Sequence, residues 1–182
     1  MSNETLIRCC APTMASLKTG NMFSSLFDSR DEMTAELRKL NRFLGRKGLR
    51  IIPLRWNEGR ALLYLYRPKM LERDLQSALA ARLLCECGYT CGKPNSCVAQ
   101  LISRIRGSEG FPHEVGLFLG YPPADVDGFM HRKDACKLSG IWKVYDDVDG
   151  AARQFARCRH CTEVYLRRYR QGYSLERLTV TA

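Results

Sequence analysis

Long hydrophobic runs are missing from this sequence of 182 residues. The longest apolar stretches, 61–66 and 115–119, fall well short of the roughly 20 residues that a membrane-spanning helix requires. The N-terminal segment also lacks the basic region followed by an apolar stretch that is typical of a secretory signal. We therefore expect a cytoplasmic protein without a membrane partner, whose nine cysteines are mostly reduced.

Familiar catalytic motifs are missing as well. The sequence contains no G-x4-G-K-[S/T] phosphate loop, no G-x-G-x-x-G dinucleotide motif, no G-x-S-x-G elbow and no H-E-x-x-H zinc motif. Helix-turn-helix, zinc-finger, RRM and KH signatures are absent too. The sequence thus indicates no reaction, and whether the protein is an enzyme stays open.

Charge is the strongest compositional signal. Lys and Arg number 29 against 19 Asp and Glu, which gives a formal net charge of +10. Such an excess favours anionic partners, namely nucleic acid, a phosphorylated or other anionic small molecule, or an acidic protein surface. The alternative is that the charge only keeps the protein soluble.

The hydrophobic pattern predicts an α+β fold in which helix predominates. Branched residues over 49–56 and 61–66, separated by Asn57-Glu58-Gly59, predict a β-hairpin over 49–66, and 140–146 is typical of a third strand. Helical periodicity predicts helices over about 28–48, 68–87, 95–107 and 147–170. No linker or repeat divides the chain. We expect one domain over 1–182, a small antiparallel sheet covered by several helices.

The run from Phe111 to Met130 is too apolar for a solvated loop and too rich in Gly and Pro for one helix. It predicts two short helical turns joined at 120–123, forming a buried corner. We expect a ligand pocket built from this corner, the turn at 18–21 and the strand around Lys143. The candidate ligand-binding residues are Lys18, Asn21, His113, Glu114, Tyr121, Asp127 and Lys143.

Some of these candidates have an ordinary structural interpretation, and others suggest a particular ligand. His113 and Glu114 could act as an acid–base pair, but adjacent helical residues point about 100° apart. Glu114 after Pro112, and Asp125 after Pro123, could instead stabilise helix starts. Lys143 could be a solvated strand lysine. Lys18 and its neighbours could cradle a phosphate.

Cysteines cluster at Cys85, Cys87, Cys91 and Cys97. Four converging thiolates could bind zinc or an iron–sulfur cluster, although the spacing matches neither a zinc ribbon nor a ferredoxin. A helix start at Cys97 would favour its thiolate and make it a reactive thiol. A second group, Cys158-Arg-His-Cys161, falls inside a predicted helix, which favours core packing over redox catalysis.

The last long helix is rich in arginine. A nucleic-acid surface on it would use Arg153, Arg157, Arg167 and Arg168. Tyr165 and Tyr169 could stack bases, yet their spacing puts them on the apolar face of the helix. The arginines are equally consistent with a solvated rim.

Several blocks together resemble a known family. These are FPHEVGLFLGYPPADVDGF at 111–129, GIWKVYDD at 140–147, CAPTMASLK at 10–18 and LERLTV at 175–180. They are similar to a family of bacterial proteins of unknown function found in Gram-positive anaerobes. The association of its genes with flavodoxin and iron-uptake genes implies a link to redox or iron metabolism. The cysteine-rich loop is a departure from the family pattern.

Three functional hypotheses follow. The first is a binding or accessory protein for a small anionic ligand or cofactor. The second is nucleic-acid binding through the arginine-rich helix. The third is a thiol- or metal-dependent enzyme that uses the cysteine cluster.

Overall fold

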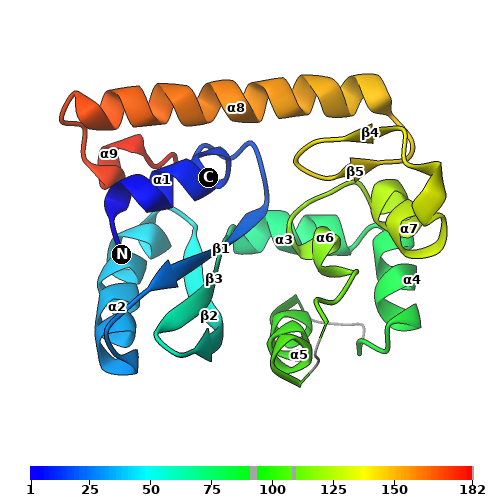
Figure 1. Ribbon diagram of the computed structural model, residues 1–182, viewed down its shortest axis with the longest axis horizontal. Coiled ribbons are helices and arrows are strands. Elements are labelled where there is room, and N and C mark those ends of the chain that lie inside the picture. Colours follow the sequence, from blue (N-terminus) through cyan, green and yellow to red (C-terminus); the bar gives the residue numbers. More distant parts are fainter. Residues whose placement is uncertain (91–93, 108–109, 182) are drawn as a thin grey trace. The chain divides into compact units, whose positions relative to one another are not determined.

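A computed structural model of the protein describes residues 1–90, 94–107 and 110–181. It confirms the α+β class with helix predominating (Figure 1). The chain packs as two compact units. Unit 1 comprises Met1–Lys69 and Cys158–Ala182, and unit 2 comprises Met70–Arg157. The expectation of one domain over 1–182 stays a prediction.

Unit 1 contains a three-stranded antiparallel sheet in the order β1-β3-β2. Its elements are α1 (Asn3–Met14), β1 (Gly20–Leu26), α2 (Arg30–Arg46), β2 (Arg50–Asn57), β3 (Arg60–Tyr66), the C-terminal part of α8 (Val148–Arg170) and α9 (Leu175–Leu178). The predicted hairpin over 49–66 is confirmed as β2 and β3. The third strand was wrongly predicted, because β1 and not the segment 140–146 pairs with β3.

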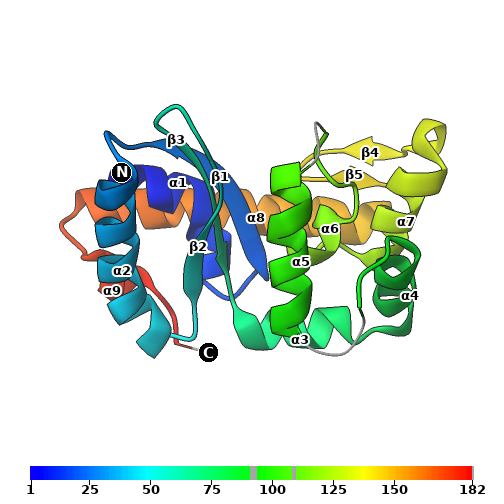
Figure 2. The same ribbon diagram turned by 90° about the horizontal axis from the view of Figure 1, so that it is seen from below.

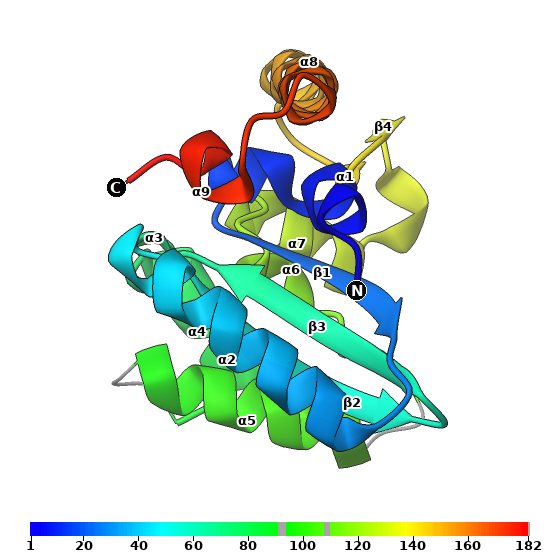
Figure 3. The same ribbon diagram turned by 90° about the vertical axis from the view of Figure 1, so that its left-hand side faces the viewer.

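The core of unit 1 follows from alternation along β3. Ala61, Leu63 and Leu65 lie on one face of the sheet and are fully buried in one cluster with residues of α1, α2 and α9. Figure 3 views the molecule from the side of these helices and shows α2 along the strands. Helix α2 begins at the cap Ser29, whose side chain accepts a hydrogen bond from the Glu32 N–H.

Among the residues that the structure describes, Arg67 is the largest fully buried side chain. Its Nε donates to the Thr13 carbonyl and its Nη2 to the Met14 carbonyl, each at 2.8 Å. The remaining bonds go to the carbonyls of Lys47, at 3.1 Å, and Val180, at 2.8 Å. The guanidinium thus satisfies carbonyls at the C-terminal ends of α1 and α2, where the helix dipoles favour a cation. It joins these helices to the C-terminal segment without any carboxylate.

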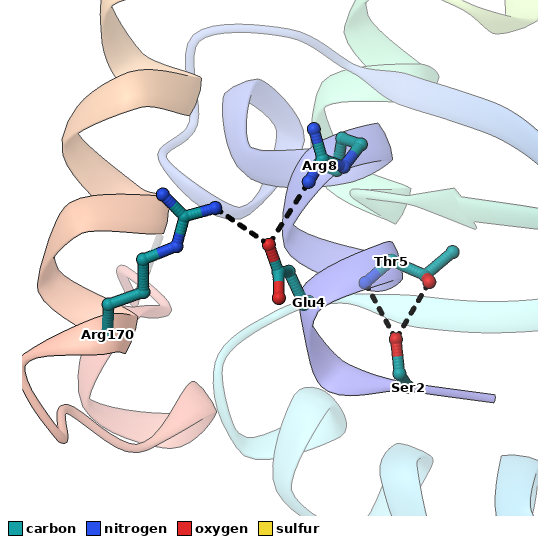
Figure 4. Close-up of polar contacts among 5 residues, drawn as sticks. All are labelled: Ser2, Glu4, Thr5, Arg8 and Arg170. Carbon is teal, nitrogen blue, oxygen red and sulfur yellow. Dashed lines mark hydrogen bonds and ion pairs between the residues drawn. The ribbon is translucent and has the colours of Figure 1, made fainter.

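Glu4 links α1 to α8 on the surface of unit 1 (Figure 4). Its Oε1 accepts from Arg170 Nη2 at 3.0 Å and from Arg8 Nη2 at 3.1 Å. The hydrogen bond from Arg170 is the main cause that lowers the pKa of Glu4 below its ordinary value. At the start of the same helix, Ser2 Oγ accepts from the Thr5 N–H at 3.1 Å and caps α1.

Unit 2 is mainly helical, with one short hairpin. Its elements are α3 (Pro68–Leu75, which begins at the unit boundary), α4 (Ala78–Glu86), α5 (Pro94–Gly107), α6 (Val115–Phe118), α7 (Pro123–His131), a 3-10 turn (Lys133–Ala135), β4 (Leu138–Ser139), β5 (Lys143–Val144) and the N-terminal part of α8. The hairpin β4–β5 lies beside α7 (Figure 2).

Two predicted elements of unit 2 differ from the structure. The helix expected over 68–87 is two helices, because Ser77 has an extended backbone and its side chain caps α4 by accepting from the Ala80 N–H. The strand expected over 140–146 is only the two residues of β5, paired with β4 in a separate sheet. The two helical turns predicted for the 111–130 corner are confirmed as α6 and α7.

Within the described ranges, none of the helices has both the length and the apolar character needed to cross a membrane.

The Arg67 network predicts a large loss of stability on Arg67→Lys. A lysine ammonium donates at most three hydrogen bonds from one point, so buried carbonyls lose their partner at about 1–3 kcal/mol each. We expect the free energy of unfolding, from urea denaturation, to fall by about 3 kcal/mol. The control is Arg60→Lys, an exposed arginine at the start of β3, the strand that Arg67 follows. Equal effects of the two substitutions would show that the network is not important.

The Glu4 contacts predict a small stabilisation that depends on pH. Because the folded pKa is depressed, the contribution is present above the ordinary value of 4.5 and is lost as the pH falls through the folded pKa. Glu4→Gln should lower Tm slightly at pH 7 and have no effect at pH 2. Glu163→Gln, an exposed position on α8, serves as the control and should leave Tm unchanged at both pH values.

Candidate functional site

A cavity of about 140 Å³ lies within unit 2, between the 111–130 corner and the β4–β5 hairpin. We call it the aromatic cavity. Its lining residues are His113, Val115, Gly116, Tyr121, Asp125, Val126, Phe129, Trp142 and Lys143. His113 and Lys143 are exposed, whereas Asp125, Val126 and Trp142 are buried. Exposed nitrogen-bearing side chains therefore lie at the mouth, and apolar and aromatic groups lie deeper.

The aromatic rings of the cavity form two pairs. Tyr121 and Trp142 stack with their centroids 5.0 Å apart and their planes at 28°. His113 and Phe129 meet edge to face at 5.1 Å and 89°. Lys143 Nζ lies 5.5 Å from the centroid of Phe129, within the range of a cation–π contact. These contacts define how the four rings and the Lys143 ammonium are placed relative to one another.

Asp125 is a buried carboxylate that connects two sides of the cavity by hydrogen bonds. Its Oδ2 accepts from Trp142 Nε1 at 2.8 Å. Its Oδ1 accepts from the backbone N–H groups of Tyr145, at 2.7 Å, and Asp146, at 3.1 Å. One buried carboxylate thereby ties α7 to the segment between β5 and α8, and fixes the indole that forms a wall. Sequence analysis assigned Asp125 only to the helix start and missed this role.

The corner depends on glycine where elements approach closely. A Cβ atom on Gly116 would lie 2.8 Å from Val126 Cγ2 and 3.0 Å from Tyr121 Cδ2, both of which line the cavity. Gly120 connects α6 to α7 with φ of 74°, in the left-handed region that other residues rarely adopt. Tyr121 follows directly, and its hydroxyl donates to the Ile141 carbonyl at 3.2 Å. Burial raises the pKa of Tyr121 to about 12, so the phenol stays protonated at neutral pH.

Of the predicted ligand-binding residues, three line the aromatic cavity: His113, Tyr121 and Lys143. Glu114 does not, and it shares no site with His113. It is buried, accepts from the Tyr89 hydroxyl at 3.0 Å and lies 3.7 Å from Arg104 Nη1. Burial and the nearby carboxylate raise the pKa of Tyr89 well above its ordinary value. Glu114 therefore serves an internal network and offers no acid–base group to the cavity.

Asp127 also points elsewhere. It lies on α7, 3.1 Å from His131 Nδ1 and 3.7 Å from Arg82 Nη2, and it does not line the cavity.

The turn at 18–21 belongs to unit 1, and its side chains bind internally. Lys18 Nζ is buried and donates to the Gly20 carbonyl at 2.8 Å. Burial lowers the pKa of Lys18 to about 8. Asn21 Oδ1 accepts from the Thr13 hydroxyl at 2.7 Å. Neither residue lines the aromatic cavity, whose lining comes from unit 2 alone.

The cysteine cluster is only partly described, since Cys91 lies outside the described residues. Cys85 is disulfide-bonded, whereas Cys87 and Cys97 have free thiols. Burial raises the pKa of Cys97, so the helix start does not produce an activated thiolate there. In the part of the chain that is described, no three His, Cys, Asp or Glu side chains are grouped to hold a metal ion. The metal site over Cys85–Cys97 stays a prediction.

Helix α8 confirms the core interpretation of its cysteines and tyrosines. Cys158 and Cys161 are buried, and Tyr165 and Tyr169 pack against the core of unit 1. The arginines proposed for nucleic acid are all exposed; they are Arg153, Arg157, Arg167 and Arg168. Arg168 stacks on Tyr173, with Arg177 over the same ring at 4.2 Å. The helix therefore presents exposed arginines, while its two tyrosines are half-buried against the core.

Trp142 and Phe129 are aromatic residues of the cavity that were not among the predicted ligand-binding residues. In the strand predicted over 140–146, alternation of side chains would place Trp142 on the face opposite Lys143. In the structure β5 begins at Lys143, so Trp142 lies in the preceding bend and both residues line the same cavity. The sequence signal for Phe129 was its helical spacing. Phe129 follows Asp125 by four residues and Val126 by three, which places the three side chains on one face of the helix.

The Asp125 network predicts that Asp125→Asn destabilises unit 2. An amide in place of the carboxylate turns one acceptor into a donor that faces an N–H group, which costs about 3 kcal/mol in the free energy of unfolding. The free energy of unfolding is measured by urea denaturation in a Trp56→Phe background. In the folded variant, the fluorescence emission of Trp142 should also shift to longer wavelength. Asp127→Asn on the same helix should cost less than about 1 kcal/mol. Similar losses for both variants would contradict the role of Asp125.

Comparison with known proteins supports membership of an uncharacterised family of unknown function. No curated protein and no solved structure matches the chain. A family model described as a protein of unknown function, DUF3793, matches residues 6–179. That match spans nearly the whole sequence, and the chain belongs to the DUF3793 family of proteins of unknown function.

Proposed function

We propose that the protein binds a small anionic ligand in the aromatic cavity, as a binding or accessory protein. The observation that carries the proposal is the position of Lys143. Its ammonium lies at the mouth of an apolar cavity and, among the residues that the structure describes, forms no ion pair. A concave apolar site with a few converging polar groups is the usual form of a small-molecule site.

The charges around the cavity favour an anion over a cation. An aromatic cage with a carboxylate can bind an ammonium group, and Asp125 is such a carboxylate. However, both Asp125 oxygens already accept hydrogen bonds from three N–H groups, and the side chain is 3% exposed. The unmatched charge at the mouth is therefore positive. His113 adds ring nitrogens that have no hydrogen-bond partner in the described ranges.

The other two hypotheses have less support. For nucleic acid, the exposed arginines of α8 supply charge, but Tyr165 and Tyr169, the candidates for base stacking, pack against the core. For a thiol enzyme, Cys97 is buried with a raised pKa. The bacterial origin, the cytoplasmic location and the link to redox or iron metabolism stay predictions.

The proposal predicts that Lys143→Met weakens anion binding. A hydrogen bond to a charged group contributes about 1.5–3 kcal/mol, which corresponds to about tenfold to a hundredfold in Kd. The probes are acetate, benzoate and inorganic phosphate, titrated against Trp142 fluorescence in a Trp56→Phe background. Since Trp142 is the tryptophan that lines the cavity, it reports occupancy directly.

Lys137→Met is the matched control, because Lys137 is an exposed lysine beside the same hairpin and does not line the cavity. It should leave Kd unchanged. The proposal is wrong if none of the three anions gives a saturable change, or if the cation choline binds and the anions do not.

A further inference from the structure

We infer that the ligand of the aromatic cavity is a planar, single-ring aromatic carboxylate. This inference rests on the proposed function and adds the shape of the ligand to its charge. It follows from the volume of the cavity, the rings that line it and the place of the ammonium group.

Volume limits the ligand to about one ring. The cavity encloses about 140 Å³. An engineered protein cavity of roughly 150 Å³ holds one benzene molecule. A nucleotide, a flavin or another fused-ring cofactor is too large to enter as a whole. Acetate or phosphate would occupy only the mouth and would leave the apolar interior unfilled.

The lining favours a flat aromatic ring over an aliphatic one. Four of the nine lining residues carry an aromatic ring: His113, Tyr121, Phe129 and Trp142. Aromatic rings attract one another in offset-stacked or edge-to-face arrangements, beyond the contribution of buried area. Both arrangements already occur within the wall, in the Tyr121–Trp142 and His113–Phe129 pairs. A puckered aliphatic ring of the same carbon count gains burial but lacks this attraction.

The charged residues of the cavity indicate which substituent the ligand ring carries and where it lies. Lys143 Nζ lies over the Phe129 ring, 5.5 Å from its centroid, and both residues line the cavity, so the ammonium is close to a ring bound there. A carboxylate attached directly to that ring reaches the mouth, where it meets Lys143 and His113. The buried carboxylate of Asp125 disfavours a second negative group deeper in the cavity. The ligand therefore carries its anionic group at one end.

The test compares benzoate with cyclohexanecarboxylate, acetate and benzyl alcohol, by the Trp142 fluorescence titration in the Trp56→Phe background. Benzoate should bind about threefold to tenfold more tightly than cyclohexanecarboxylate, the factor that one ring–ring contact supplies. It should bind at least about tenfold more tightly than acetate, because the ring adds buried apolar area. Lys143→Met should weaken the binding of benzoate and leave the Kd of benzyl alcohol unchanged.

Phe129→Leu provides a second readout, since it keeps an apolar side chain and removes one ring. The ratio of the cyclohexanecarboxylate Kd to the benzoate Kd should fall toward one in this variant. If cyclohexanecarboxylate or acetate binds with the same Kd as benzoate, and this binding still depends on Lys143, the inference of an aromatic ring is overturned and anion binding stands. If benzyl alcohol binds with the same Kd as benzoate, the inference of a carboxylate group is overturned. Absence of binding by every anion overturns the proposed function itself.

Discussion

The carboxylate of Asp125 is the constraint on which the candidate site depends. A buried carboxylate is unfavourable unless its oxygens accept hydrogen bonds. Here an indole N–H and two backbone N–H groups meet that need. The consequence is geometric, because the segment from Trp142 to Asp146 has to stay against α7. The aromatic cavity exists where that segment and the 111–130 corner are held together.

Unit 1 also contains a buried charged side chain with backbone partners, but there the charge is positive. Arg67 is buried among backbone carbonyls at helix ends, as Asp125 is buried among N–H groups. In both units one charged side chain satisfies backbone groups that regular secondary structure leaves unpaired. In both arrangements the buried charge is satisfied largely by backbone groups. Lys143 is instead exposed, and its place beside an apolar cavity is the basis of the binding role that we propose.

Sequence reasoning predicted local structure well and long-range contacts poorly. Apolar periodicity and caps were enough for α2, for the β2–β3 hairpin and for the α6–α7 corner, because these signals lie within a few residues. The pairing of β1 with β3 joins segments about 40 residues apart, and nothing local in 20–26 distinguishes it from a turn followed by apolar residues. For the site, Lys143 and Tyr121 were found from their types, but Trp142 was misplaced by assuming a longer strand. Asp125 and Arg67 were missed because a buried charge looks like a surface one until its backbone partners are known.

The most direct test of the account is a nitrogen-edited NMR titration of the two tryptophan indole N–H signals with benzoate. Trp56→Phe assigns them, and the Trp142 indole donates to Asp125 at 2.8 Å. The account predicts a saturable shift of the Trp142 signal and of the backbone signals of His113 and Lys143, with Trp56 unchanged. Shifts confined to the arginines of α8, with Trp142 unmoved at saturation, would contradict binding in the aromatic cavity.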